Sequence, residues 1–318
     1  MESSRARRRR RGRPSRRRPF LCAALAVVAV GGATAGGTVC VRERARSGNA
    51  AVSSAATLPA SPSAGAGEEA SVEPVTEPAV DRDALLSGAM ARVAVPSGAR
   101  VSVAVLETDS GGSAVYGDAA FDTASIVKVD ILAALLLRAQ DAGRGLTAAE
   151  RAYAEKMIEN SDNASATALW HTIGGAAGLD AANARFGLNA TSGGADGLWG
   201  LTRTTAADQL VLLRQVFGED SRLSAASRAY VRGLMESVRA DQRWGVSAAA
   251  RGGSSALKNG WLPRGTTGLW DVNSVGRVTV DGTGYLVAVL SDGTRSQAEG
   301  VALVEAAAKA AVSAFTAG

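Results

Sequence analysis

Ser125 and Lys128 have the side chains and the spacing of a serine nucleophile with a lysine base. They lie in the segment 121–137, whose apolar residues recur with the helical period of about 3.6 residues, and both fall on the same stripe as those residues. Three positions along a helix bring the lysine nitrogen toward the serine hydroxyl. The positive end of the helix dipole and the apolar neighbours both favour a neutral amine, which could take the serine proton.

The same spacing also has a purely structural explanation. Ser125 could cap the N-terminus of the helix, and Lys128 could run its stem along apolar surface with the amine in water. A second copy, Ser255 to Lys258, lies in a segment with the alternation of a strand, where residues three apart point to opposite faces. Only the copy at Ser125 is therefore expected to pair its two side chains.

Ser161, Asp162 and Asn163 follow one predicted helix and precede another, at 164–173. Residues of these types are ordinary in turns and at helix N-termini, which is one explanation of the motif. The other explanation is functional: Ser161 would relay a proton, and Asn163 would hold a substrate amide. The local sequence leaves both explanations open.

Lys258, Asn259, Gly260 and Trp261 form a third group of interest. Asn-Gly between apolar runs favours a hairpin turn, but the segment 263–268, with Pro, Arg and two Gly, provides a turn of its own. We predict that a strand passes through Asn259 and Gly260 and reverses at 263–268. A glycine inside that strand would let a ligand backbone approach closely, and Trp261 would line the cleft.

The elements that must position these residues follow from the spacing of apolar residues along the chain. Strands are expected at 101–106, 113–117, 256–261, 268–280 and 285–291, and helices at 82–94, 125–142, within 147–246 and at 296–316. Two strands, a helical block, three strands and a last helix predict an α/β protein of the α+β type. Its antiparallel five-stranded sheet would be flanked by helices and interrupted by an all-helical lobe.

The N-terminal part of the chain differs from this pattern. Residues 1–18 hold ten Arg, and an uncharged, mostly apolar run follows, so residues 1–41 are expected to be an export signal or a membrane anchor. Residues 42–81 are rich in Ala, Ser, Pro and Glu and contain no aromatic residue, which predicts a flexible linker. The domain is expected at 82–318, outside the cytoplasm, either secreted or anchored to the membrane by the N-terminal segment.

Charge and cysteine content exclude several classes of function. Residues 1–18 and 42–46 together carry +11 of a chain whose net charge is +5, so residues 47–318 carry −6. A mildly acidic body gives no electrostatic basis for binding nucleic acid. Both cysteines, Cys22 and Cys40, lie in the N-terminal segment, so the body has no disulfide, no thiol nucleophile and no zinc–thiolate site. We expect no metal and no cofactor.

Taken in order, the three motifs resemble those of the penicillin-recognising serine hydrolases, which include class A β-lactamases and related D,D-peptidases. The resemblance covers residues 82–318 and implies the fold of β-lactamases and transpeptidases. The conjunction of motifs is more specific than any one of them. The motifs are Ser125-x-x-Lys128, Ser161-Asp162-Asn163 and Lys258-Asn259-Gly260.

The resemblance assigns a role to each of five side chains. It implies that Ser125 is acylated, that Lys128 is its base and that Ser161 passes the proton to the leaving nitrogen. Asn163 would bind the substrate amide. Lys258 would attract the substrate carboxylate and support the proton relay.

The resemblance also implies an oxyanion hole and exposes two departures. Backbone N–H groups of Ser125 and Trp261 would form the oxyanion hole. Asn259 replaces the usual hydroxyl residue of the third motif, and the resemblance implies that Asn259, Gly260 and Trp261 bind the substrate together with Lys258 and Asn163. Class A enzymes use a Glu after the second motif to activate the deacylating water, and residues 160–218 contain no Glu. Acylation is therefore supported, whereas rapid hydrolysis of the acyl-enzyme is not.

These observations predict a class A β-lactamase-like serine hydrolase that forms an acyl-enzyme on Ser125 with β-lactams. One alternative is a D,D-peptidase or esterase that acts on cell-wall peptide, and another is a penicillin-binding sensor module that does not hydrolyse its ligand. The partner in each case would be a small β-lactam or a peptidoglycan peptide, and the protein is expected to be a monomer.

Overall fold

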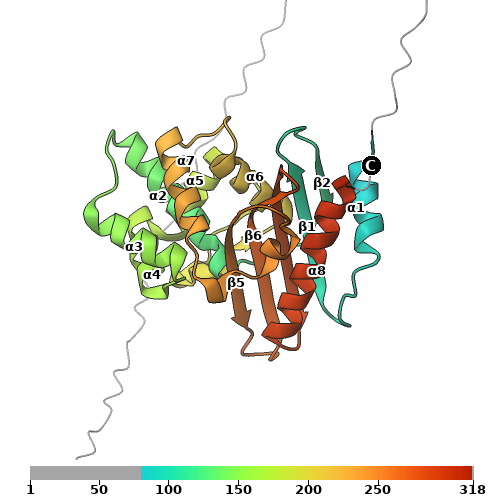
Figure 1. Ribbon diagram of the computed structural model, residues 1–318. Helices are drawn as coiled ribbons and strands as arrows, with labels where there is room; N and C mark the ends of the chain where they lie inside the picture. Colours follow the sequence, from blue (N-terminus) through green and yellow to red (C-terminus); the bar gives the residue numbers. More distant parts are fainter. Residues whose placement is uncertain (1–79, 317–318) are drawn as a thin grey trace, which may run out of the picture. The chain divides into compact units, whose positions relative to one another are not determined.

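The computed structural model describes residues 80–316, coloured by sequence in Figure 1. The predicted export signal or anchor at 1–41 and nearly all of the predicted linker at 42–81 lie outside the described residues. Within residues 80–316, none of the helices combines the length and the apolar composition that crossing a bilayer requires.

A five-stranded antiparallel sheet forms the centre of the fold, as predicted. The order across the sheet is β2-β1-β7-β6-β5, so the first hairpin joins the last three strands through the pairing of β1 with β7. The third motif lies on β5, which is therefore an edge strand. The strands are β1 (Arg100–Glu107), β2 (Ser113–Tyr116), β5 (Ser255–Pro263), β6 (Trp270–Val280) and β7 (Thr283–Thr294).

Helices cover the sheet in two groups. Helices α1 and α8 pack together on one side of the sheet, and α2 to α7 form a helical lobe on the other (Figure 1). This arrangement confirms the predicted α+β class with its all-helical lobe. The helices are α1 (Arg82–Met90), α2 (Val127–Asp141), α3 (Ala148–Glu159), α4 (Asn163–Ile173), α5 (Gly175–Phe186), α6 (Ala206–Phe217), α7 (Ala225–Glu236) and α8 (Gln297–Thr316).

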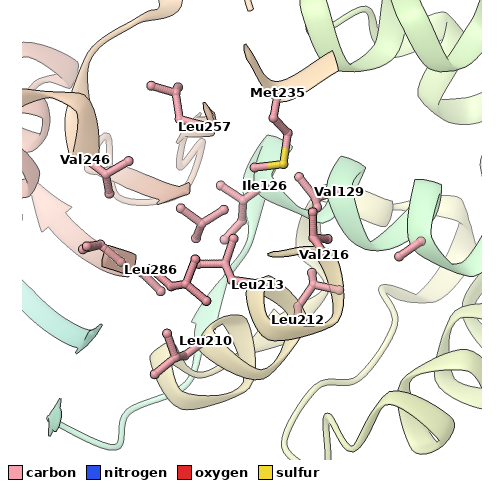
Figure 2. Close-up of a cluster of buried hydrophobic side chains, with 14 of the residues drawn as sticks. Ile126, Val129, Leu210, Leu212, Leu213, Val216, Met235, Val246, Leu257 and Leu286 are labelled. Atoms are coloured by element: carbon pink, nitrogen blue, oxygen red, sulfur yellow. The ribbon is translucent and has the colours of Figure 1, made fainter. Parts of the chain in front are cut away.

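Helix α2 is buried on almost every side. The sequence predicted one buried stripe, yet twelve of its fifteen residues are buried, because α2 runs through the lobe in contact with α4, α5 and α7. Apart from Lys128 and Asp130, the buried residues of α2 are apolar, which suits this central position. Figure 2 shows Ile126, directly before α2, and Val129, in its first turn, beside Leu213 and Val216 of α6. This packing fixes the first helical turn, where the candidate nucleophile and base lie.

Helix α4 begins within the second motif. Asp162 is its N-cap, and the carboxylate accepts the Ser165 N–H at 2.7 Å, as the structural explanation of the motif requires. The preceding residue, Ser161, has a φ of 55°, which is uncommon for a residue other than glycine. The helix ends at Gly174, whose φ of 98° closes it in the left-handed conformation. The turn before α4 thus has a well-defined backbone.

The third motif lies inside a strand, as predicted. Strand β5 continues through Asn259 and Gly260, which pair with Ser274 and Asn273 of β6. The chain then reverses in the segment 264–269, where the Gly268 N–H donates to the Arg264 carbonyl at 2.7 Å. The alternative of a hairpin turn at Asn-Gly is therefore excluded.

Candidate active site

Three segments that are far apart in the sequence meet around one lysine amine. Ser125 lies in a single 3-10 turn directly before α2, and Lys128 lies in the first turn of that helix. Ser161 and Asn163 lie at the start of α4, and Lys258 lies on β5. The structure thus brings together the five side chains to which the resemblance assigns roles.

The amine of Lys128 has four oxygen atoms within hydrogen-bond distance. Its Nζ lies 2.9 Å from Ser125 Oγ, 3.1 Å from Ser161 Oγ, and 2.7 Å from both the Ser161 carbonyl oxygen and Asn163 Oδ1. The carbonyl and the amide oxygen can only accept hydrogen bonds. A neutral amine that donates to these two acceptors keeps its lone pair for a hydroxyl proton, and the hydroxyl of Ser125 is the nearer one.

Burial also favours the neutral form of this lysine. The side chain of Lys128 is fully buried, and burial lowers its pKa to about 7, while the nearby carboxylate of Asp162 acts in the opposite direction. At neutral pH about half of such amines are unprotonated, whereas a lysine in water is almost wholly charged. A lysine with such a pKa can accept a proton near neutral pH.

The hydroxyl of Ser161 lies between two amines. Ser161 Oγ is 3.1 Å from Lys128 Nζ and 3.0 Å from Lys258 Nζ, and the latter also donates to the Asn259 carbonyl at 2.9 Å. Lys258 is fully buried, and burial together with the charge of Lys128 keeps its pKa well below the usual value. This geometry favours a proton relay through Ser161.

Backbone strain accompanies the two serines. Four residues other than glycine have a left-handed backbone within residues 80–316, and two of them are Ser161, with φ 55°, and Ala124, with φ 47°, which directly precedes Ser125. Such conformations cost free energy and persist where the surrounding structure enforces them, often at functional sites. Both serine hydroxyls that approach Lys128 are thus positioned by constrained backbone.

Asn259 does not face the cleft, which corrects the prediction that its side chain binds substrate. Alternation along β5 places it on the face opposite to Lys258. Its Nδ2 donates to the carbonyls of Gln242, at 2.8 Å, and Trp244, at 2.9 Å, and the side chain is fully buried. Asn259 therefore joins the preceding segment to the sheet.

The sequence predicted that the backbone of a ligand approaches Gly260 closely. In the structure, the backbone of this chain approaches it instead. A Cβ atom at this position would lie 2.7 Å from Ser125 N, 2.8 Å from Thr123 O and 2.9 Å from Ile126 N. Only a residue without a side chain lets β5 pack directly on this turn. Gly260 thus lets β5 support the turn that carries Ser125.

The side chain of Trp261 also differs from the prediction. It lies on the same face of β5 as Asn259, opposite to Lys258, and its ring packs against Trp244 with the centroids 5.8 Å apart. The ring therefore does not line the cleft on the side of Lys258. The predicted oxyanion hole uses only the backbone N–H of Trp261, so it stays a prediction.

Trp199 is a further residue of the site, and it belongs to none of the three sequence motifs. It is partly buried in the loop between α5 and α6, and its ring centroid lies 4.9 Å from Lys128 Nζ. Its Nε1–H donates to Thr167 Oγ1 at 3.1 Å. No hydrophobic period marks this loop. No sequence motif marks Trp199 as a neighbour of the lysine either.

A network of charged and polar side chains was also missed; it lies under residues 123–126, the turn that carries the candidate nucleophile Ser125 and is called the nucleophile turn below. Asp122, which is buried, pairs with Arg203 and Arg264, and Arg264 also pairs with Asp271 at 2.9 Å. Asn273 of β6 donates through Nδ2 to the carbonyls of Asp122 and of the next residue. These contacts join the turn before Ser125 to the sheet, and no short sequence motif marks them.

The fold resembles solved structures of penicillin-recognising proteins. A mutant of PBP-A in an acyl-enzyme complex with penicillin G superposes with a TM-score of 0.63 at 23% identity, over 74% of this chain and 97% of that one. A class A beta-lactamase from Bacteroides cellulosilyticus gives a TM-score of 0.63 at 16% identity, over 74% and 99% of the two chains. At these identities the likeness establishes the fold.

Sequence comparison identifies more closely related chains and a family. A Mycobacterium bovis protein named "Putative lipoprotein LppW" is 27% identical over 176 residues, which are 53% of this chain and 56% of that protein. This chain thus spans about half the length of the curated relatives it matches. The sequence profile of the beta-lactamase enzyme family matches residues 141–315, which include the second and third motifs and begin shortly after the first. Since that match covers more than half of the chain, the protein belongs to the beta-lactamase enzyme family.

Proposed function

We propose that this protein forms an acyl-enzyme on Ser125 with β-lactams or related acyl donors. The proposal rests on one observation, the 2.9 Å contact between Ser125 Oγ and the Nζ of Lys128. Because two obligate acceptors lie 2.7 Å from that Nζ, a neutral amine directs its lone pair at the serine hydroxyl. A serine whose proton can be removed in this way is an activated nucleophile.

The acylation step uses the groups around this amine in turn. Ser125 Oγ would attack the acyl carbon while its proton passes to Lys128 Nζ, and the C–N bond of the donor would then break. The leaving nitrogen would receive its proton from Ser161, which Lys128 and Lys258 flank. Asn163, whose oxygen faces Lys128, would offer its Nδ2 to a substrate carbonyl. The backbone N–H groups of the oxyanion hole would stabilise the charge on the acyl oxygen.

Hydrolysis of the acyl-enzyme is expected to be slow. Deacylation needs a base that activates water, and residues 160–218 contain no Glu that could act as this base. The same residues would serve a D,D-peptidase that acts on peptidoglycan peptide, or a sensor that is acylated once. The solved mutant of PBP-A, captured as a penicillin acyl-enzyme, supports the idea that this fold can hold such an intermediate.

The proposed location is outside the cytoplasm, where such substrates occur. The apolar run after the N-terminal arginines supports export or a membrane tether, and the name of the mycobacterial relative supports a lipid-anchored location for that protein. A monomer is sufficient for the proposed chemistry, because every side chain of the site belongs to one chain.

A turnover assay with a chromogenic cephalosporin distinguishes the three candidate functions. We expect one burst of product equal to the enzyme concentration, followed by slow turnover. Sustained rapid hydrolysis would support an efficient β-lactamase instead. If a fluorescent penicillin fails to label the protein at all, the acylation proposal is wrong. Ser125→Ala is the control, and it should remove both the burst and the label.

A further inference from the structure

The indole ring of Trp199 lies over the amine that serves as the base. The ring centroid is 4.9 Å from Lys128 Nζ, within the distance at which an aromatic face attracts a cation. The opposite, polar edge of the indole donates its N–H to Thr167 Oγ1 of α4 at 3.1 Å. The orientation of the ring is therefore fixed by a partner other than the lysine.

The loop that carries this ring is joined to the nucleophile turn. The Thr202 carbonyl accepts the Thr123 N–H at 2.9 Å, and the Thr202 N–H donates to the Trp199 carbonyl at 3.1 Å. The hydroxyl of Thr202 accepts the Gly194 N–H at 3.1 Å, which closes the loop on itself. The ring thus has a preformed position that does not depend on the charge of Lys128.

Acylation creates a positive charge at this place. The serine proton converts the neutral amine of Lys128 into an ammonium ion. The titratable groups that act on Nζ are Asp162, at the N-cap of α4, and Lys258, on β5; the other close groups are neutral. The Asp162 carboxylate also accepts the Ser165 N–H, and Lys258 opposes a second cation. The other groups that can favour the new charge are the neutral oxygens around Nζ and the face of the Trp199 ring.

We propose that the face of Trp199 stabilises the ammonium ion that forms on Lys128 as Ser125 attacks. The ring takes the part that a carboxylate could otherwise play beside this ion. The negative face of the indole attracts the cation more than the neutral amine, so the contact strengthens during the step. Trp199 acts through Lys128 and is a positioning residue. This inference rests on the proposed acylation of Ser125.

The step balances without any additional reactant. The Ser125 O–H bond and the C–N bond of the donor break, and an ester C–O bond forms. The proton moves from Ser125 to Lys128 and then, through Ser161, to the leaving nitrogen. Trp199 forms no covalent bond, and its effect lasts while the proton resides on the amine.

A graded series of fluorinated tryptophans at position 199 tests the proposal. Each fluorine withdraws electrons from the ring face and weakens its attraction for a cation, with little change in shape. The full-length protein would carry Trp or its mono-, di-, tri- or tetrafluoro analogue, and the rate constant of acylation by a fluorescent penicillin would be measured from pH 5 to 9. The same analogues at Trp270, outside the site, are the matched control.

We expect the rate at high pH to fall steadily across the series, by about tenfold in total, which corresponds to about 1.4 kcal/mol. The pH at which the rate reaches half its maximum should move downward, because a weaker cation contact also makes the free ammonium less stable. The curves should therefore separate above neutral pH and converge below it. A ring that only fills space would give superimposed curves.

Each other outcome counts against a specific claim. Equal rates across the series at Trp199, or an equal decline across the series at Trp270, would overturn the role of the ring while leaving the acylation of Ser125 intact. Absence of any labelling in the unmodified protein would overturn the proposed function, and this inference with it. Trp199→Leu, which removes the ring face, should reproduce the loss seen with the tetrafluoro analogue.

Discussion

Replacing Gly260 by alanine should disable the site through the backbone of the nucleophile turn. The added Cβ would lie 2.7, 2.8 and 2.9 Å from three backbone atoms of residues 123–126. None of these atoms belongs to a flexible side chain that could move aside. Either β5 or the turn must therefore shift, and with it the hydroxyl of Ser125.

The size of the shift follows from the contact distances. Non-bonded heavy atoms separate to about 3.5 Å, so the 2.7 Å contact requires a displacement of about 0.8 Å. A misplacement of about 1 Å at a reacting group costs on the order of 100-fold in rate. Overpacking of this kind also destabilises a protein by about 1–3 kcal/mol. We expect acylation about 50- to 100-fold slower in a protein that still folds.

The assay compares Gly260→Ala with Gly265→Ala. Gly265 lies in the turn that follows β5, and a Cβ there would meet no atom within 4 Å. The acylation rate with a fluorescent penicillin and the unfolding midpoint in urea are measured for both variants. Gly265→Ala should match the parent protein in both measurements. An unchanged acylation rate in Gly260→Ala would refute the close approach of β5 to the nucleophile turn.

Two further predictions concern pH. Burial lowers the pKa of Lys128 to about 7, so the second-order rate constant of acylation should rise through pH 7 and level off above it. A rate constant that stays the same from pH 5 to 9 would contradict the neutral-base mechanism. Burial raises the pKa of Asp130, in the middle of the lobe, to about 7 from 3.8. The unfolded chain releases this proton at lower pH than the folded protein, so the stability of the protein should fall between pH 4 and 7. Urea unfolding should show Asp130→Asn gaining about 4 kcal/mol relative to the parent over that interval, and a pH-independent difference would refute this cause.

The sequence correctly predicted those parts of the site whose geometry depends on residues that are close together in the chain. A helical spacing of three residues pairs Ser125 with Lys128, and the turn chemistry around Asp162 begins α4 where the second motif requires it. The choice between two turns near Gly260 also followed from local chemistry, because the segment after it offered a better reversal. Each of these predictions depends on a few neighbouring residues.

The missed features depend on how distant segments pack. The prediction for α2 allowed one buried stripe, because nothing in its own sequence reveals that other helices of the lobe surround it. The approach of the nucleophile turn to Gly260, and of Trp199 to Lys128, joins segments more than 70 residues apart. Asn259 is different: the alternation of β5 already placed it opposite to Lys258, and the motif resemblance obscured that simpler signal.

Intact-protein and peptide mass spectrometry after incubation with penicillin G tests the central claim most directly. The account predicts one penicilloyl group per molecule, located on the peptide that contains Ser125, with its yield rising through pH 7 at short times. Ser125→Ala should acquire no adduct under the same conditions. An unmodified parent protein, or an adduct on any other residue, would contradict the account.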